Sequence, residues 1–330
     1  MAGTGTAHLR EHDARLTVED LVVEFRTKGG HTVRAVSGVS FDVLPGETLG
    51  IVGESGCGKS SVARAVMHLP APVSGRVRLG SVSLGELDAG ALRRSRVAMQ
   101  IVFQDPVSSL NPRRKVKDLV QEGASIWGQG SASSRSAAAR SVLDAVGLDP
   151  DVVWNRRPHE LSGGQCQRVS IARALVMEPE LLICDEILAS LDVSVQAQLL
   201  NLLRTAKGER RLSMLFIAHD LAAVKNISDR VLVMYLGKVC EVLDVGVLDR
   251  PVTHHPYTRL LLESVPVVSA SRVAPVRGSA AAQDLPSPID PPSGCRFRTR
   301  CPLATDRCAA EEPVLEAKAD GQFVACHEVP

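Results

Sequence analysis

The sequence predicts an α/β protein organised around a phosphate-binding loop, and three observations support this fold class. Residues Gly53–Ser61 read GESGCGKSS, which matches the pattern G-x-x-x-x-G-K-[ST]. An apolar strand at residues 49–52 precedes this loop, and a helix is expected over Ser60–Leu69. Later apolar runs end in acidic or histidine side chains, as strands of an open α/β sheet do at the edge that binds ligands.

The residue types in this loop suit a nucleotide polyphosphate. Its glycines allow successive backbone N–H groups to converge on one point, and the following helix adds the positive end of its dipole. Lys59 would reach the terminal phosphates, and the Ser60 hydroxyl would bind Mg²⁺. A glycine-rich turn that fits the pattern by chance is the alternative. The residues expected to contact the nucleotide here are Gly53, Glu54, Ser55, Gly56, Cys57, Gly58, Lys59, Ser60 and Ser61.

Composition narrows the class of protein. The chain has 330 residues, and its 38 Lys and Arg nearly balance its 37 Asp and Glu, so no global field favours nucleic acid. No apolar run has the length of a membrane-spanning helix, and the charged N-terminus lacks the core of a signal peptide, so a cytosolic chain is expected. Eight cysteines in such a protein favour metal or cluster ligation over disulfides. Four scattered cysteines are expected to be structural: Cys57, Cys166, Cys184 and Cys240.

The segment ahead of the loop reads as an antiparallel layer. Strands are expected at residues 16–25 and 33–43, with a turn at Lys28-Gly29-Gly30 between them. Such a layer could support the nucleotide base. Phe25 and His31 are the candidates for stacking on the base, although either side chain could simply pack against the layer.

A polar side chain follows the next predicted strand. Pro70 stops the helical pattern after the loop, and Val97–Phe103 reads as a strand that ends at Gln104. A glutamine at this position can reach Mg²⁺ or the attacking water. A merely solvated glutamine is the alternative.

A second anion-binding helix start is expected near residue 162. Residues 111–160 have a mainly helical pattern, interrupted by the flexible segment 128–134. Ser162 is a good N-cap for a helix whose apolar face is Val169, Ala172 and Leu175. One nucleotide needs one phosphate cradle, so this second cradle is expected to face the nucleotide of another subunit. Its residues are Ser162, Gly163, Gly164 and Gln165.

Side chains that could take part in catalysis follow two further predicted strands. The apolar run 181–184 precedes Asp185 and Glu186, which would hold Mg²⁺ and deprotonate the attacking water respectively. The run 214–218 precedes His219, which could contact the terminal phosphate. A solvated acidic pair and a structural histidine are the alternatives. A hairpin over residues 231–243, with its turn at Leu236-Gly237, closes the domain near residue 250.

With these motifs in this order, the first 250 residues resemble the nucleotide-binding subunit of ABC transporters. In this resemblance GESGCGKS is the Walker A motif, LSGGQ is the signature and LLICDE is the Walker B motif with its catalytic glutamate. Gln104 corresponds to the Q-loop, Ser190-Leu191-Asp192 to part of the D-loop and His219 to the switch histidine. The resemblance implies a P-loop ABC ATPase that uses ATP and Mg²⁺, with an antiparallel β subdomain and a helical subdomain at about residues 105–165.

The family also implies a head-to-tail dimer. Each ATP then lies between the Walker A motif of one subunit and the LSGGQ motif of the other. One departure is that Ile187-Leu188-Ala189 replaces the proline and hydroxyl residue usual after the catalytic glutamate, which would loosen the D-loop. Glu186 and His219 remain, so a hydrolytic site is still expected.

The remaining residues resemble the C-terminal extension of the oligopeptide/dipeptide importer branch. HPYT at 255–258 precedes a short predicted helix, and a Pro-, Ser- and Ala-rich linker is expected at about 267–293. The sequences of residues 109–116 and 192–203 also resemble that branch. The predicted domains are therefore residues 1–250 and 251–330.

Four cysteines in the tail form a candidate ligand set. Cys295, Cys301, Cys308 and Cys326 are separated by five, six and seventeen residues, without the close pairs usual in structural zinc sites. Four thiolates suit Zn²⁺ or an iron–sulfur cluster. The resemblance favours a [4Fe–4S] cluster, with zinc and unligated thiols as the alternatives. His327 is expected to be a bystander.

The resemblance implies the ATPase subunit of a peptide-class ABC importer at the cytoplasmic face of the membrane. The implied partners are a second, commonly unlike ATPase, two transmembrane permeases and an extracytoplasmic substrate-binding protein, with no nucleic acid. The region Gln104–Trp127 is the usual permease contact in the family. A soluble ABC ATPase acting on nucleic acid or ribosomes is the alternative, as is a subunit for a nickel or other small-solute importer. The C-terminal extension disfavours an exporter.

Overall fold

The structure is a computed structural model that describes residues 5–10, 13–27, 29–189, 191–264 and 286–330. The chain forms two compact units, of which the first combines residues 1–86 with 217–330 and the second comprises residues 87–216. The second unit is thus inserted into the first along the sequence. The division of the chain at residue 250 stays a prediction.

The first unit contains a four-stranded antiparallel sheet in the order β2-β1-β4-β5. The predicted N-terminal strands are confirmed, because β1 pairs antiparallel with β2 and Leu16 lies opposite Val43. In β1 every second side chain is buried, and the alternation shifts at a bulge where Asp20 has a φ of 48°. The strands are β1 (Leu16–Arg26), β2 (Thr32–Val43), β4 (Ser74–Leu79) and β5 (Val82–Ser83).

A second sheet in this unit joins the phosphate loop to the C-terminal tail. Its strand order is β11-β12-β10-β9-β3, in which β3 and β9 are parallel and β10 is antiparallel to both β9 and β12. The predicted hairpin over residues 231–243 is therefore confirmed. The strands are β3 (Thr48–Val52), β9 (Arg230–Tyr235), β10 (Lys238–Asp244), β11 (Glu316–Ala319) and β12 (Gln322–Val324).

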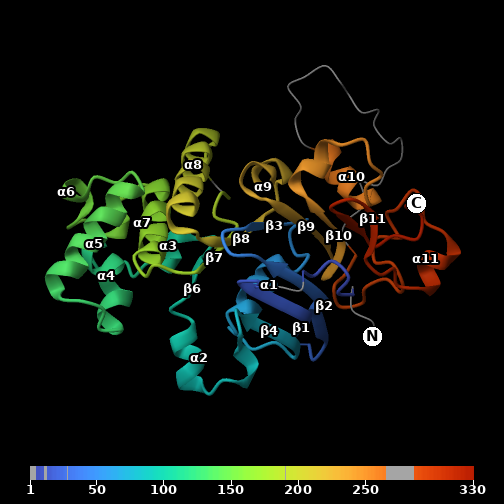
Figure 1. Ribbon diagram of the computed structural model, residues 1–330, viewed down its shortest axis with the longest axis horizontal. Helices are drawn as coiled ribbons and strands as arrows, with labels where there is room; N and C mark the ends of the chain where they lie inside the picture. Colours follow the sequence, from blue (N-terminus) through green and yellow to red (C-terminus); the bar gives the residue numbers. More distant parts are fainter. Residues whose placement is uncertain (1–4, 11–12, 28, 190, 265–285) are drawn as a thin grey trace. The chain divides into compact units, whose positions relative to one another are not determined.

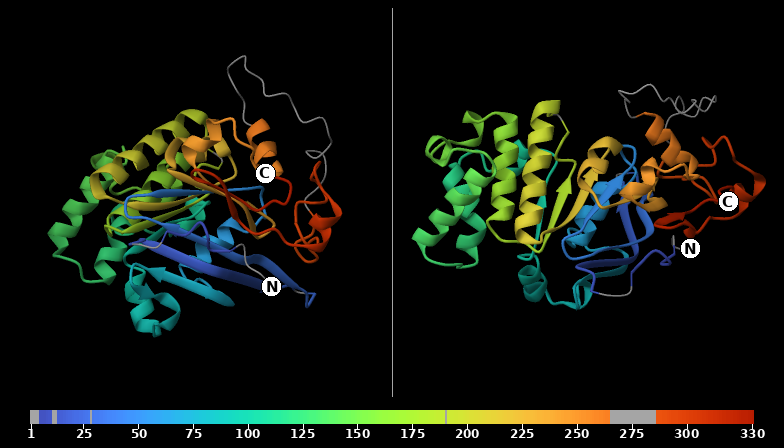
Figure 2. Two further views of the ribbon diagram at one scale, coloured as in Figure 1. Left: turned by 45° about the vertical axis from the view of Figure 1, so that its right-hand side comes forward. Right: turned by 45° about the horizontal axis from the view of Figure 1, so that its top comes forward.

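The helices of the first unit support these two sheets. Helix α1 contacts β1 and β2, and α9 packs on β3 (Figure 2). The helix predicted after HPYT is confirmed as α10, which begins at Pro256 with the His255 ring as its N-cap. The helices are α1 (Lys59–Val66), α9 (Leu221–Ile227), α10 (Pro256–Glu263) and α11 (Asp306–Ala310), with short 3₁₀ turns at Leu84–Glu86 and Val245–Asp249.

The second unit combines a few strands with a group of helices (Figure 1). Its strand order is β8-β7-β6, and β6 and β7 run parallel. The helical pattern predicted for residues 111–160 is confirmed by α4 and α5, which pack against each other and against α7. The strands are β6 (Met99–Val102), β7 (Leu181–Asp185) and β8 (Ser213–Ala218, whose last two residues belong to the first unit). The helices are α2 (Ala89–Ser95), α3 (Pro106–Ser109), α4 (Val116–Ile126), α5 (Ala132–Ala145), α6 (Pro150–Val153), α7 (Gly163–Leu175) and α8 (Val193–Arg210), with a 3₁₀ turn at Pro158–Glu160.

Two predicted helix boundaries are wrong. Helix α1 ends at Val66 instead of Leu69, because His68 has a φ of 53° and the N–H of Leu69 turns back to the Arg64 carbonyl at 2.8 Å. Helix α5 begins at Ala132, inside the segment predicted to be flexible, because the Ser131 hydroxyl accepts a hydrogen bond from the N–H of Ser134 and caps it.

Two further predictions concern segments that the structure describes only in part. Most of the predicted linker lies outside the described residues, as does Ser190 of the predicted D-loop. Within the described ranges, no helix combines the length and apolar character needed to cross a bilayer.

Candidate nucleotide-binding site

The phosphate loop connects the buried strand β3 to helix α1 in the first unit. Gly56 and Gly58 have positive φ values of 82° and 106°. A Cβ at Gly58 would come within 2.1 Å of the Ala35 carbonyl oxygen, and one at Gly53 within 2.2 Å of the Met234 carbonyl oxygen. The backbone thus requires glycine at these positions, as the motif suggested.

Lys59 places a positive charge inside this loop. Its side chain is only 2% exposed, and its ammonium donates to the carbonyl oxygens of Gly53 at 2.7 Å and Glu54 at 3.1 Å. Lys59 is also the first residue of α1, whose N-terminus carries a partial positive charge. The loop therefore combines an ammonium with a helix N-terminus, which is an arrangement suited to phosphate. Nucleotide contacts by the individual loop residues stay a prediction.

Glu54 and Cys57 tie the loop to other parts of the first unit. The N–H of Glu54 donates to the Tyr257 hydroxyl at 2.8 Å, and its carboxylate pairs with Arg300 at 2.8 Å. The carbonyl of Cys57 accepts a hydrogen bond from the N–H of Gly237 at 2.7 Å. Sequence reasoning missed Tyr257 and Arg300, because they lie 203 and 246 residues from Glu54 and no local pattern links them.

His219 follows β8 directly, as the sequence predicted, and its side chain is exposed. The next residue, Asp220, is the N-cap of α9, because its carboxylate accepts a hydrogen bond from the N–H of Ala222 at 2.9 Å. The predicted stacking candidates Phe25 and His31 are also exposed, in β1 and just before β2. The roles proposed for these three side chains stay predictions.

In the second unit, Gln104 and the acidic pair lie at one edge of the sheet. Val102 of β6 is opposite Cys184 of the parallel strand β7, so the residues after each strand emerge at the same edge. Asp185 is 2% exposed, whereas Gln104 is exposed. Burial, followed by the charge of Asp185, raises the pKa of the Cys184 thiol. This edge therefore offers carboxylate and amide oxygens, which are ligands that suit Mg²⁺.

Glu186 adopts a backbone conformation that is uncommon for its residue type. Its φ is 50°, and its carbonyl accepts a hydrogen bond from the N–H of Ala189 at 3.1 Å. The unusual residues Ile187 and Leu188 that follow are buried, at 1% and 5% exposure. Helix α8 then begins at Val193, capped by the Asp192 carboxylate, which accepts a hydrogen bond from the N–H of Val195 at 2.9 Å.

The predicted second anion cradle is an exposed helix start. The Ser162 hydroxyl accepts from the N–H of Gln165 at 3.2 Å, and the Gln165 side chain accepts from the N–H of Ser162 at 3.0 Å, so the N-cap is confirmed. Gly163 is exposed, and a Cβ added to it would meet nothing within 4 Å. The predicted apolar face is only part of what α7 buries, because buried residues surround most of the helix.

The four tail cysteines lie near one another in the first unit. Burial raises the pKa of Cys295 to about 11, and the neighbouring thiols of Cys301, Cys308 and Cys326 add to this shift. Among the described residues, no group of three or more His, Cys, Asp or Glu side chains has the spacing of ligands around one metal ion. The His327 ring contacts the Glu311 carbonyl at 3.2 Å.

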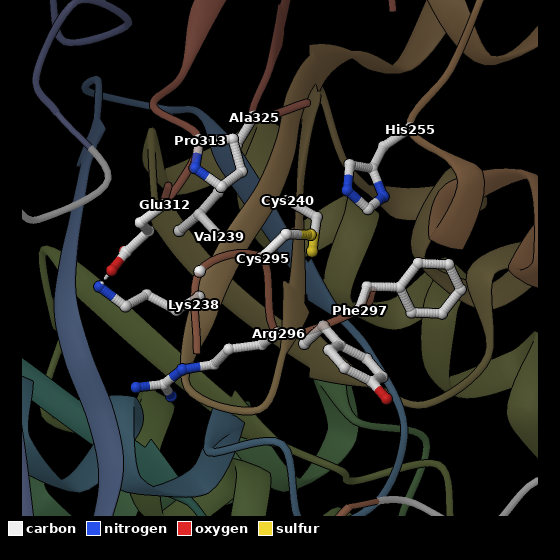
Figure 3. Close-up of a pocket in the computed structure, with 12 residues that line it drawn as sticks. Lys238, Val239, Cys240, His255, Cys295, Arg296, Phe297, Glu312, Pro313 and Ala325 are labelled. Carbon is white, nitrogen blue, oxygen red and sulfur yellow. Dashed lines mark ion pairs between the residues drawn. The ribbon is translucent and has the colours of Figure 1, made fainter. Parts of the chain in front are cut away.

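Cys240, which was expected to be one of the scattered structural cysteines, lies close to the tail cysteines. Cys240 of β10 and Cys295 line the same cavity of about 30 Å³, and their side chains point toward each other (Figure 3). Burial, followed by the charge of Cys295, raises the pKa of Cys240 well above its ordinary value. No local sequence pattern indicates this proximity, because the hairpin and the tail are far apart along the chain.

Taken together, the fold and the phosphate loop define a nucleotide-binding protein of the P-loop class. Residues 36–189 match the ABC transporter family, and residues 247–308 match the C-terminal region of oligopeptide/dipeptide transporters. The chain is 45% identical over 324 residues to the oligopeptide transport ATP-binding protein OppF of Haemophilus influenzae, covering 95% of this chain and 97% of the relative.

Solved structures agree with this class. The cbiO1 subunit of the cbiONQ ABC transporter complex from Clostridium perfringens has a TM-score of 0.63 at 29% identity, covering 71% of this chain and 90% of that protein. The ATP-binding cassette MJ0796 in a dimeric post-hydrolysis state with ADP and phosphate has a TM-score of 0.64 at 25% identity, covering 70% of this chain and 98% of that one. The chain belongs to the ABC transporter ATP-binding subunits that carry an oligopeptide/dipeptide-type C-terminal region. It is therefore an ATPase whose hydrolysis is coupled to transport.

Proposed function

We propose that this chain hydrolyses ATP to power the import of peptides of the dipeptide and oligopeptide class. The observation that carries the proposal is the agreement over 95% of the chain with a peptide-transport relative, through both the ATPase motifs and the C-terminal region. The phosphate loop agrees with it, because Lys59 and the N-terminus of α1 form a site suited to a polyphosphate.

Within the ATP site we assign roles by position and chemistry. The phosphate loop and Ser60 would hold the phosphates and Mg²⁺, and Asp185 and Gln104 would complete the Mg²⁺ ligands. When bound, Mg²⁺ neutralises charge that develops on the phosphates. Glu186 would take the proton of the attacking water, and His219 would contact the terminal phosphate. The open helix start at Ser162–Gln165 supports a head-to-tail dimer in which this cradle meets the partner's nucleotide.

The partners and the location follow from this role. The chain would pair with a second, unlike ATPase and with two transmembrane permeases, at the cytoplasmic face of the membrane. A substrate-binding protein on the other side would deliver the peptide. Residues Gln104–Trp127 would contact a permease. We also propose that residues 251–330 form a C-terminal domain of the oligopeptide/dipeptide-transporter type, whose strand β12 adds to the sheet of the first unit.

For the tail cysteines we propose a [4Fe–4S] cluster held by Cys295, Cys301, Cys308 and Cys326. The donor chemistry fits, because these thiols are mutual neighbours. Among the described residues, no group of three or more His, Cys, Asp or Glu side chains is placed to hold a metal ion, and zinc and unligated thiols stay the alternatives.

Purification without oxygen tests the cluster. The chain should carry iron with visible absorption, and Cys308→Ser should lose both. Cys166→Ser, which removes a buried thiol from the second unit, is the matched control and should keep them. Wild-type protein with neither iron nor visible absorption would exclude the cluster.

Co-purification from the native membrane tests the transport role. A stable complex with two multi-spanning proteins is the expected result. Recovery with nucleic acid or ribosomes instead would favour a soluble ABC ATPase. Uptake of a labelled peptide by proteoliposomes of the complete complex tests the peptide class.

A further inference from the structure

The segment between the first two tail cysteines reaches the phosphate loop. Arg300 donates to the two carboxylate oxygens of Glu54 at 2.8 and 3.1 Å. The Arg300 side chain is 4% exposed and the Glu54 side chain 25%, so this ion pair is largely shielded from water. Shielded pairs are screened less than surface pairs, and losing one partner leaves the other charge uncompensated.

A second arginine of the same segment supports the loop indirectly. Arg296 donates to the Ser37 hydroxyl at 2.9 Å and to the carbonyl of Leu236. Leu236 belongs to the turn between β9 and β10, and the next residue, Gly237, donates its N–H to the Cys57 carbonyl in the loop at 2.7 Å. The segment thus contacts the loop directly through Arg300. Through Arg296 it contacts the loop indirectly, by way of this turn.

Tyr257 of α10 supplies a third contact, from a rigid position. Its side chain is fully buried, and its ring lies 4.8 Å from that of Tyr235 and 5.4 Å from that of Phe297 between centroids. Its hydroxyl accepts the N–H of Glu54 at 2.8 Å. This N–H is therefore directed at Tyr257, which fixes the backbone at the start of the loop.

We propose that Arg300 and Tyr257 are positioning residues for ATP, through which the C-terminal cysteine region sets the nucleotide affinity of the phosphate loop. An unpaired Glu54 carboxylate beside the loop would repel a polyphosphate, and Arg300 neutralises that charge. Tyr257 holds the loop backbone in the conformation seen here. This inference rests on the proposed ATP function, because it concerns the same loop.

The test measures the affinity of the full-length chain for a fluorescent ATP analogue with Mg²⁺. Arg300→Met should weaken binding by roughly 5- to 30-fold, a typical size for coupling between two sites. Arg298→Met is the matched control, because Arg298 lies in the same segment but bonds only to Ser293 among the contacts described, at 2.9 Å. The control should bind ATP as the wild type does.

A double-mutant cycle separates positioning from general damage. In a Glu54→Gln background, Arg300→Met should change the affinity by about twofold or less, since the repelling carboxylate is gone. An equal loss with and without Glu54, or no loss in Arg300→Met, would overturn the inference.

Two milder variants decide the case if Arg300→Met does not fold. Arg300→Lys should keep most of the affinity because it keeps the charge, and Tyr257→Phe should weaken binding by about threefold or more because the N–H of Glu54 loses its acceptor. Wild-type affinity in Tyr257→Phe would overturn the inference. A wild-type chain that binds no ATP would contradict the proposed function itself.

Discussion

The individual residue that defines the proposed chemistry most sharply is Glu186. It follows a fully buried strand and adopts a positive φ, so the backbone places this residue directly after the end of the strand. Glu186→Gln should keep ATP binding and reduce turnover by about 10²- to 10⁴-fold, because the amide cannot accept the proton of the water. Hydrolysis assays and nucleotide titrations on the same preparation measure the two effects.

A matched variant checks that prediction. Glu209→Gln changes an exposed glutamate on α8 in the same unit and should leave turnover intact. Undiminished turnover in Glu186→Gln would remove Glu186 from the role of base.

The stability of the first unit should depend on pH through His255. Burial lowers the pKa of His255 to about 4, and its ring accepts the N–H of Tyr257 at 3.0 Å, which requires the neutral form. The unfolded chain takes up this proton below its ordinary pKa of about 6.5, so the stability contribution is complete above that pH and is lost as pH falls toward 4. At pH 5 the loss should be on the order of 1 to 2 kcal/mol.

Chemical denaturation at pH 7.5 and pH 5 measures this effect. His255→Asn keeps a side-chain acceptor for the helix cap but does not titrate, so it should flatten the difference between the two pH values. A wild-type chain and a variant with the same pH dependence would contradict the role of His255.

At the scale of single elements, the N-terminus of α7 tests the composite ATP site. Gly163→Ala should fold normally, because the added Cβ meets nothing within 4 Å in the chain. In the assembled dimer, the methyl group would occupy the surface proposed to face the partner's nucleotide, so hydrolysis should fall by about tenfold or more. Melting curves and hydrolysis rates of the complex measure the two properties.

Gly208→Ala provides the control for this change. Gly208 lies in α8, and a Cβ there also meets nothing within 4 Å, so both stability and hydrolysis should be retained. Full activity of Gly163→Ala in the complex would contradict the proposed dimer.

Sequence reasoning predicted the elements whose causes are local. The strands β1 and β2, the hairpin of β9 and β10 and the cap of α7 follow from periodicity, turn residues and the Ser162–Gln165 pair. The predicted end of α1 was wrong, because the helix stops where His68 adopts a left-handed backbone conformation. A histidine does not indicate this conformation in a sequence as a glycine does. Likewise, the polar pattern of residues 128–134 did not indicate that Ser131 would cap α5.

At the scale of the whole molecule, the C-terminal region is an integral part of the first unit. The fully buried Glu241 of β10 accepts from His254 at 2.8 Å and from the Gln322 side chain at 2.7 Å, and the N–H of His255 donates to it at 3.0 Å. These partners come from the segment before α10 and from β12. A buried carboxylate needs such partners to remain charged, so the tail stabilises the sheet that supports the phosphate loop.

Long-range contacts of this kind explain what the sequence could not show. The ATPase motifs and the cysteine tail were each recognisable alone. Their connection through Arg300, Tyr257 and Cys240 depends on pairings across more than 50 residues of chain, which no local spacing encodes. The residues of the candidate site could therefore be predicted from the sequence, but the distant residues that hold the phosphate loop in place could not.

The central claim is that ATP hydrolysis by this chain drives peptide import, and uptake of a labelled peptide by proteoliposomes of the complete complex tests it most directly. With ATP and the binding protein present, the wild-type complex should accumulate the peptide. Lys59→Ala should reduce ATP binding by roughly 10- to 100-fold and abolish accumulation, because charged hydrogen bonds to phosphate are lost. Lys225→Ala, which removes an exposed ion pair on α9, should leave uptake unchanged. Accumulation that does not require ATP, or that persists in Lys59→Ala, would contradict the account.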